Sequence, residues 1–194
     1  QPEGDNLVFA PHLYDPGLIA GNAWSGQEPD PAFEGFRQFQ ARSGNPILLG
    51  EFGVGRTATG GDPWFDRVME LLDTHRMHAT LWEYSASEDL WNGEDLSVVG
   101  PEGEERRILD LYVRPCLRAV AGSDIRFAWD RLAGEGEASW EAAEGVTELT
   151  FPLRNFPSGP RDLHVAGART QLGEDGTLCF DAEPGTRVTA QFRA

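Results

Sequence analysis

The chain has 194 residues, of which 40% are hydrophobic and 25% charged, and these fractions are typical of a globular protein rather than a disordered one. Its 32 acidic residues outnumber its 16 basic residues, which are all arginines. The resulting net charge of −16 excludes nucleic acid as an expected partner, because a phosphate backbone would be repelled. No apolar run reaches the about 18 residues of a membrane-spanning helix, so we expect no integral membrane segment.

The cysteines give no sign of a metal site, and the N-terminus bears on where the protein is located. Cys116 and Cys179 lack metal-ligand spacing, and the four histidines form no zinc pattern with them, so we expect no metal site. The first residue is Gln1 rather than Met, and no signal segment opens the chain. We interpret this end as a product of processing, cloning or cleavage, and we expect a secreted or extracellular protein rather than a cytoplasmic one.

The first predicted unit is a strand over residues 7–10 that leads into Pro11-His12-Leu13-Tyr14 and then into a loop rich in Gly, Pro and Asp. Asp30-Pro31 next predicts an N-cap and a first-turn proline. The helix that follows carries Phe33, Phe36 and Phe39 near one face.

The second unit contains the apolar run Pro46-Ile47-Leu48-Leu49, which predicts a strand buried on both faces, as in a parallel sheet. This strand ends at Glu51, in a segment bounded by Gly50 and Gly53. A second Asp-Pro pair, Asp62-Pro63, opens a helix whose apolar face is formed by Trp64, Val68, Leu71 and Leu72.

The third unit begins with a strand over residues 79–85 that contains Trp82, and a helix through Ile108, Leu109 and Tyr112 follows. Beyond Gly122 the pattern changes to short alternating segments at residues 126–129, 149–153, 177–180 and 187–192. We therefore predict an α/β domain over residues 1–122 and a small antiparallel β-sandwich over residues 123–194.

The number of strands limits what the α/β domain is. Three parallel strands leave two open sheet edges, whereas a closed (β/α)8 barrel needs eight strands and about 250 residues. The first domain is thus predicted to be the C-terminal part of a TIM barrel, strands 6 to 8.

Active sites of such barrels lie at the carboxyl ends of the strands, and here those ends present His12, Tyr14, Glu51 and Trp82. A retaining glycosidase needs a carboxylate nucleophile, a second carboxyl group about 5 Å away, and groups that position the sugar. Tyr14 is placed to donate a hydrogen bond to Glu51, and the Trp82 indole is suited to stacking on a sugar ring.

Three strand-end motifs carry a more specific resemblance. The motifs are Ala10-Pro11-His12-Leu13-Tyr14-Asp15, Leu49-Gly50-Glu51-Phe52-Gly53, and Leu81-Trp82-Glu83-Tyr84-Ser85 with Asp89-Leu90-Trp91-Asn92. They resemble the final motifs of family 5 glycoside hydrolases of clan A, in particular the endoglycoceramidase group and its relatives that act on glucosylceramide or steryl glucosides.

The resemblance implies a retaining β-glycosidase that needs no cofactor and acts on glycolipid-type β-glucosides such as glycosylceramides. It implies that Glu51 is the nucleophile and that His12, Tyr14 and Trp82 bind substrate or position Glu51. In that family the acid/base Glu follows an Asn on strand four, and this chain contains no Asn-Glu pair. The expected partner is therefore the N-terminal half of the same barrel, as a separate chain or a missing segment.

Two other classes of function stay open from the sequence. The chain is either that glycosidase portion, a catalytically incomplete fragment, or a non-catalytic protein that keeps Tyr14 and Trp82 to bind a carbohydrate or glycolipid. One carboxylate alone cannot perform two-carboxyl chemistry, and this is the observation that keeps the alternatives open.

Overall fold

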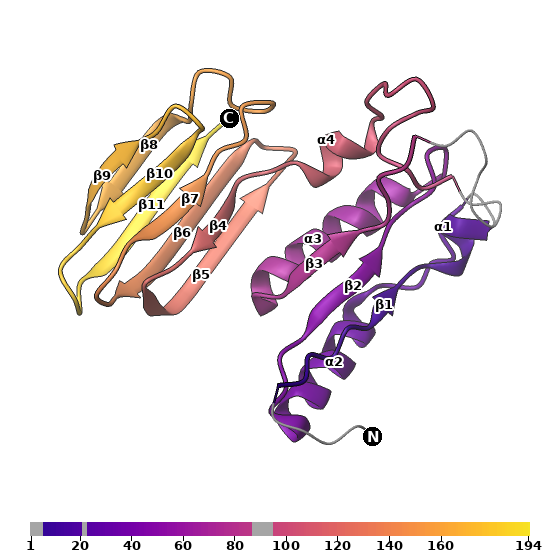
Figure 1. Ribbon diagram of the computed structural model, residues 1–194, viewed down its shortest axis with the longest axis horizontal. Helices are drawn as coiled ribbons and strands as arrows, with labels where there is room; N and C mark the ends of the chain where they lie inside the picture. The colour runs from indigo at the N-terminus through magenta and orange to yellow at the C-terminus, as the bar shows by residue number, and fades with distance from the viewer. Residues whose placement is uncertain (1–5, 21–22, 87–94) are drawn as a thin grey trace. The chain divides into compact units, whose positions relative to one another are not determined.

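The protein is described by a computed structural model that covers residues 6–20, 23–86 and 95–194 (Figure 1). The chain divides into two compact units, Gln1–Leu111 and Tyr112–Ala194. The first contains a parallel sheet with helices, and the second contains two antiparallel sheets. The predicted succession of an α/β part and an all-β part is confirmed, whereas a domain boundary at residue 122 stays a prediction.

The parallel sheet of the first unit consists of β1 (His12–Leu13), β2 (Leu48–Phe52) and β3 (His78–Leu81), in the order β1-β2-β3. His12 is the register partner of Glu51. The first strand lies later in the chain than predicted, because residues 7–10 contribute only an isolated bridge between Phe9 and Ile47. Parallel pairing nonetheless continues from this bridge to β1, since the Gly50 amide donates to the Pro11 carbonyl at 2.8 Å.

Two long helices, α2 (Asp30–Ser43) and α3 (Gly61–His75), cover one face of this sheet, and the short helices are α1 (Pro16–Ala20) and α4 (Ile108–Tyr112) (Figure 1). The ring centroids of Phe39 on α2 and Phe9 are 4.2 Å apart. Phe65 on α3 stacks on Phe52 at the end of β2, with centroids 5.3 Å apart. Trp64 on α3 is almost fully enclosed in the same core, which is the burial that its apolar face predicted.

Two Asp-Pro pairs lie at the starts of the long helices, but neither aspartate is the N-cap, contrary to the prediction for Asp30. The N-cap of α2 is Pro29 and that of α3 is Gly60, and both lack a side-chain capping bond. Asp30 lies in the first turn and accepts from Arg67 Nε of α3 at 3.1 Å. This hydrogen bond is the main cause that lowers the pKa of the Asp30 carboxyl. The prediction failed because a cross-helix arginine competes for the carboxylate that a cap would use.

His75, in the last turn of α3, makes the stability of the first unit depend on pH. Its imidazole stacks on Phe33 at 5.9 Å, and burial, with help from Arg37 and Arg67, lowers its pKa below the ordinary 6.5. The folded state thus favours the neutral ring, so stability is fully present above the unfolded pKa and is lost as the pH falls through it toward the folded pKa. We expect the melting temperature to fall between about pH 7.5 and 5.5, and to fall less in His75→Phe. An equal fall in both proteins, measured by circular dichroism, would contradict this assignment.

The second unit contains eight strands in two four-stranded antiparallel sheets, with the orders β4-β7-β10-β9 and β5-β6-β11-β8. The strands are β4 (Cys116–Ala119), β5 (Gly122–Asp130), β6 (Glu135–Ala142), β7 (Thr147–Thr150), β8 (Arg161–Ala166), β9 (Arg169–Leu172), β10 (Thr177–Asp181) and β11 (Arg187–Arg193). The four segments predicted from alternation overlap β5, β7, β10 and β11. The other four strands were not predicted.

One hydrophobic core is shared by the two antiparallel sheets. Residues of β6 and β11 from one sheet and of β7 and β10 from the other belong to a single buried cluster. Trp140 of β6 is 1% exposed and meets Phe180 of β10 edge to face, with centroids 5.0 Å apart. Such aromatic contacts supply much of the buried area of a small domain.

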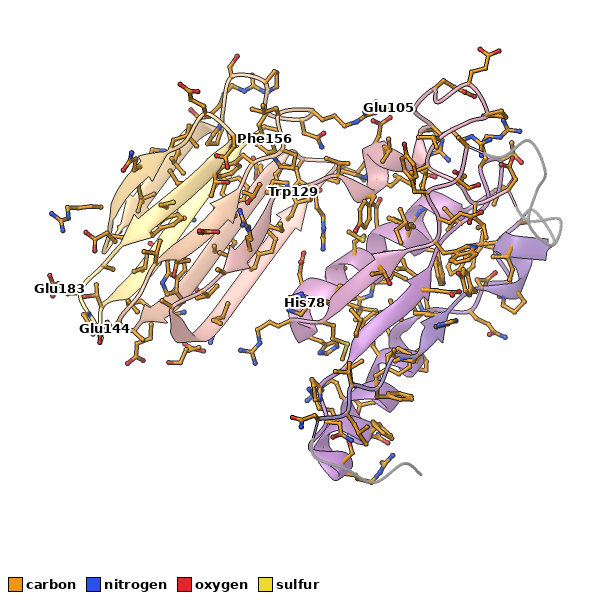
Figure 2. The ribbon with its side chains drawn as sticks, viewed as in Figure 1. His78, Glu105, Trp129, Glu144, Phe156 and Glu183 are labelled. Atoms are coloured by element: carbon orange, nitrogen blue, oxygen red, sulfur yellow. The ribbon has the colours of Figure 1, made fainter. Side chains whose placement is uncertain are left out.

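Gly136 on β6 is a point of close packing in this core. The Trp129 ring stacks on the Phe192 ring, with centroids 5.9 Å apart. The ring centroids of Trp129 and Phe156, both labelled in Figure 2, are 5.7 Å apart. A Cβ on Gly136 would overlap the Phe192 ring and lie 3.0 Å from Trp129 Cε3.

We expect Gly136→Ala to lower the free energy of unfolding of the second unit by about 1–3 kcal/mol through overpacking. Urea denaturation measures this change. The matched control is Glu137→Ala on the same strand, where the side chain is exposed, and equal midpoints for the two variants would refute the expectation.

Candidate active site

Glu51 lies near the carboxyl end of β2, one residue before Phe52, whose ring stacks on Phe65 of α3. The register of β2 against β3 shifts between Leu49 and Phe52, which marks an irregularity at the end of this strand. Irregularities of this kind re-aim side chains next to functional sites.

Tyr14 and His12 both contact the same oxygen of Glu51. The Tyr14 hydroxyl donates to Glu51 Oε2 at 3.0 Å, so the hydrogen bond predicted from the sequence is confirmed. His12 Nδ1 lies 3.2 Å from Oε2 and forms an ion pair with it when the imidazole is protonated. Neither contact involves Oε1. The Glu51 side chain is 29% exposed, so a ligand can reach it.

Gly50 gives the His12 imidazole the room that this arrangement needs. A Cβ on Gly50 would lie 3.2 Å from His12 Cδ2 and 3.4 Å from Ala10 Cβ. The distance to the His12 ring is tighter than ordinary van der Waals contact. The glycine before Glu51 therefore lets the ring lie over β2 with its Nδ1 beside the carboxylate.

Trp82 follows β3 at the same edge of the sheet. Its amide donates to the Phe52 carbonyl at 2.9 Å, and the peptide bond between Trp82 and Glu83 is cis. A Cβ on Gly53 would overlap the Trp82 carbonyl oxygen, so the end of β2 and the end of β3 approach closely only because residue 53 is glycine. Trp82 thus lies beside the Glu51 strand, as the sequence predicted, but a role in binding stays a prediction.

The loops that follow the three strands are joined to one another. The Trp24 amide of the first loop donates to the Thr59 carbonyl of the second at 2.9 Å. Arg56 of the second loop pairs with Asp95 of the third at 2.9 Å, and Asp95 also binds Arg106. The middle loop is therefore held on both sides.

The segment after Trp82 is fixed by Ser97, which is buried. The Ser97 hydroxyl accepts from the Ser85 amide at 3.0 Å and donates to the Ser85 carbonyl at 2.6 Å. The Val98 amide donates to the Glu83 carbonyl at 2.9 Å. The backbone around Tyr84 is held in place by these bonds.

The structure also shows a residue at the site that the sequence did not single out, the buried Asp15 directly after Tyr14. The predicted motif Asp89 to Asn92 lies outside the described residues. Among the residues that are described, no group of three His, Cys, Asp or Glu side chains is arranged to hold a metal ion. In that same part of the chain, no helix is both long and apolar enough to cross a membrane.

Comparison with known proteins gives a match in structure rather than in sequence. No protein-family model matches the sequence, and no curated protein matches it. The solved structures it resembles include glycosidases, and the chain shares the fold of a part of them.

One of these is endoglycoceramidase II from Rhodococcus sp., in a structure with ganglioside GM3. It gives a TM-score of 0.73 and 22% identity, over 96% of this chain and 42% of that one. A structure of the same enzyme as a lactosyl-enzyme intermediate gives a TM-score of 0.70 and 24% identity, over 96% of this chain and 41% of that one. Sterylglucosidase 1 from Cryptococcus neoformans gives a TM-score of 0.70 and 17% identity, over 96% of this chain and 37% of that one.

The predicted resemblance to the endoglycoceramidase group is thus confirmed at the level of the fold. This chain spans less than half of the length of each of these glycosidases.

Proposed function

We propose that this chain is the C-terminal portion, strands 6 to 8, of a TIM-barrel retaining β-glycosidase that acts on glycolipid-type β-glucosides. The observation that supports this most is the arrangement at Glu51, where Tyr14 and His12 meet the single oxygen Oε2. A carboxylate held from one side keeps its other oxygen for attack on a sugar. The relatives add support, since one structure is a lactosyl-enzyme intermediate and another contains a ganglioside.

In the proposed reaction Glu51 Oε1 attacks the anomeric carbon and forms an ester bond, while the bond from that carbon to the aglycone oxygen breaks. A carboxylic acid on the N-terminal portion of the barrel gives its proton to the leaving oxygen. Water then attacks the anomeric carbon from the face that the aglycone left, and the ester bond breaks. The second carboxylate takes the proton of that water, and two inversions leave the configuration retained.

The surrounding residues have separate tasks in this proposal. The Tyr14 hydroxyl holds Glu51 in the rotamer needed for in-line attack, and His12 fixes the same oxygen from β1. Trp82 offers its indole face to the sugar ring. No step needs a cofactor.

The partner is the N-terminal half of the barrel, and the sheet supplies its docking sites. Among the described residues, β1 and β3 each pair only with β2, so each has one edge with open backbone groups. Open parallel edges require further parallel strands. The proposed acid/base carboxyl group would lie about 5 Å from Glu51.

Covalent trapping tests the proposal. A 2-deoxy-2-fluoro-β-glucoside with a good leaving group slows the second step more than the first, so a retaining enzyme accumulates the ester. We expect the protein in its full natural length to gain the mass of one fluorosugar, located by peptide mass spectrometry on Glu51. Hydrolysis of an aryl β-glucoside without any labelling of Glu51 would refute the assignment of Glu51 as the nucleophile. Neither hydrolysis nor labelling, together with measurable sugar binding, would favour the non-catalytic alternative.

A further inference from the structure

The loop after β1 is organised around Asp15, which directly follows Tyr14. The side chain of Asp15 is 3% exposed. Its Oδ1 accepts from the Leu18 amide at 3.0 Å and from the Ser25 amide at 3.1 Å, and its Oδ2 accepts from the Ser25 hydroxyl. Among the described residues, Asp15 is the only buried one that carries a carboxyl group.

A buried carboxylate is costly unless donors replace the water that it loses. All three donors here come from the loop itself, one from the first turn of α1 and two from Ser25. The Asp15 side chain thus caps α1 and closes the loop over ten residues at once. We refer to Asp15, Leu18 and Ser25, joined by these hydrogen bonds, as the clasp.

The far end of the clasp is attached to the loop of the Glu51 strand. Ala23 forms a parallel bridge with Thr59, and the Trp24 amide donates to the Thr59 carbonyl at 2.9 Å. The clasp therefore connects the residue after Tyr14 to the loop that follows β2.

We propose that Asp15 is a positioning residue that holds the Tyr14 hydroxyl against Glu51, an inference that rests on the proposed function of Glu51. Tyr14 is fixed on its N-terminal side by β1, whose His12 is in register with Glu51, and on its C-terminal side by the clasp. Loss of the clasp removes the restraint on the backbone that follows Tyr14. Asp15 acts on the reaction only through Tyr14, because its own oxygens are used by the loop.

Two substitutions of Asp15 distinguish a role in positioning Tyr14 from a role of the negative charge of Asp15. In Asp15→Asn, Oδ1 still accepts from both amides and the new amide group can donate to the Ser25 hydroxyl, so the clasp is kept without its charge. In Asp15→Ala the clasp is lost. For the full-length protein on an aryl β-glucoside, we expect Asp15→Ala to lower kcat by about 10- to 100-fold with little change in KM, and Asp15→Asn to stay within about threefold of the natural protein.

A double variant tests whether the effect passes through Tyr14. Adding Asp15→Ala to Tyr14→Phe is expected to slow the reaction by no more than about threefold, because the hydroxyl that Asp15 positions is already gone. Fully additive losses would overturn the proposal, as would an Asp15→Asn variant as slow as Asp15→Ala.

A readout without catalysis separates failure of this inference from failure of the proposed function. The chain has three tyrosines, so 13C labelling at Cζ gives a simple spectrum in which Tyr14→Phe identifies the Tyr14 signal. We expect this signal to move in Asp15→Ala and to stay in Asp15→Asn, whether or not the protein hydrolyses anything. A signal that stays in Asp15→Ala overturns the positioning role. If Asp15→Ala does not fold, Ser25→Ala removes only the hydroxyl donor, and the same signal must then move, though less.

Discussion

Glu51→Gln is expected to reduce kcat for aryl β-glucoside hydrolysis by about 10⁴- to 10⁶-fold, the range found when a covalent nucleophile is removed. The amide has nearly the same shape as the carboxylate, and its oxygen can still accept from Tyr14, so substrate binding should be largely kept. Initial rates with the full-length protein, together with binding of an unreactive sugar by calorimetry, measure the two effects separately.

Chemical rescue sharpens this test. Glu51→Ala leaves space at the anomeric carbon, so added azide can attack in place of Oε1 and give a glycosyl azide with inverted configuration. Glu83→Gln is the matched control, since it removes a carboxylate next to Trp82 that has no role in the proposed reaction. Residual activity of Glu51→Gln above about one-tenth of the natural rate would rule out Glu51 as the nucleophile.

Tyr14→Phe is expected to have the second largest effect, a loss of about 10²- to 10³-fold in kcat, comparable to the loss of one preorganised donor in other active sites. Without the hydroxyl, His12 is the one remaining contact of Glu51 Oε2 that the described residues show, and it is an ion pair only when the imidazole is protonated. The carboxylate then samples other rotamers, and fewer encounters have the geometry for attack.

The control for Tyr14→Phe is Tyr112→Phe. This variant also removes one tyrosine hydroxyl, but from helix α4, and it leaves Glu51 unchanged. We expect the two variants to differ in kcat by at least about 30-fold at similar melting temperatures. Similar kcat values for both would mean that the contact between Tyr14 and Glu51 is structural.

The elements that the sequence predicted well are those in which burial and local pattern agree. The helices at Asp30 and Gly61 carry an apolar face at helical spacing, and β2 begins in the apolar run of residues 46–49, so each is specified by its own residues. The meeting of Tyr14 with Glu51 also followed from sequence, because parallel strands end at one edge of a sheet.

The strands that were missed have weaker local signals. In β6 the inward positions include Ala138 and Ala142, and only Trp140 among the inward residues is large and apolar. Three of its outward residues are glutamates, which are depleted in strands. Its pairing with β5 and β11 decides its structure, and that pairing is not visible in eight residues alone.

Asp15 was missed although its sequence contained a usable signal. The chain has three Asp-Pro pairs before residue 64, and two of them were interpreted as helix starts, the first with Asp30 as the N-cap. The structure reverses the assignment: Asp30 and Asp62 are bound by arginines, whereas Asp15 caps α1. Which aspartate caps depends on whether an arginine reaches it, and this is a tertiary property.

Among the described residues, two tryptophans are enclosed, Trp64 in the first unit and Trp140 in the second, so each unit carries its own fluorescent reporter. Neither residue has more than 2% of its surface exposed. Emission from an enclosed indole shifts to longer wavelength when water reaches it, so Trp64→Phe and Trp140→Phe, compared with the natural chain, would report the unfolding of one unit at a time. A sugar that binds near Glu51 should then delay the transition of the first unit and leave that of the second where it was.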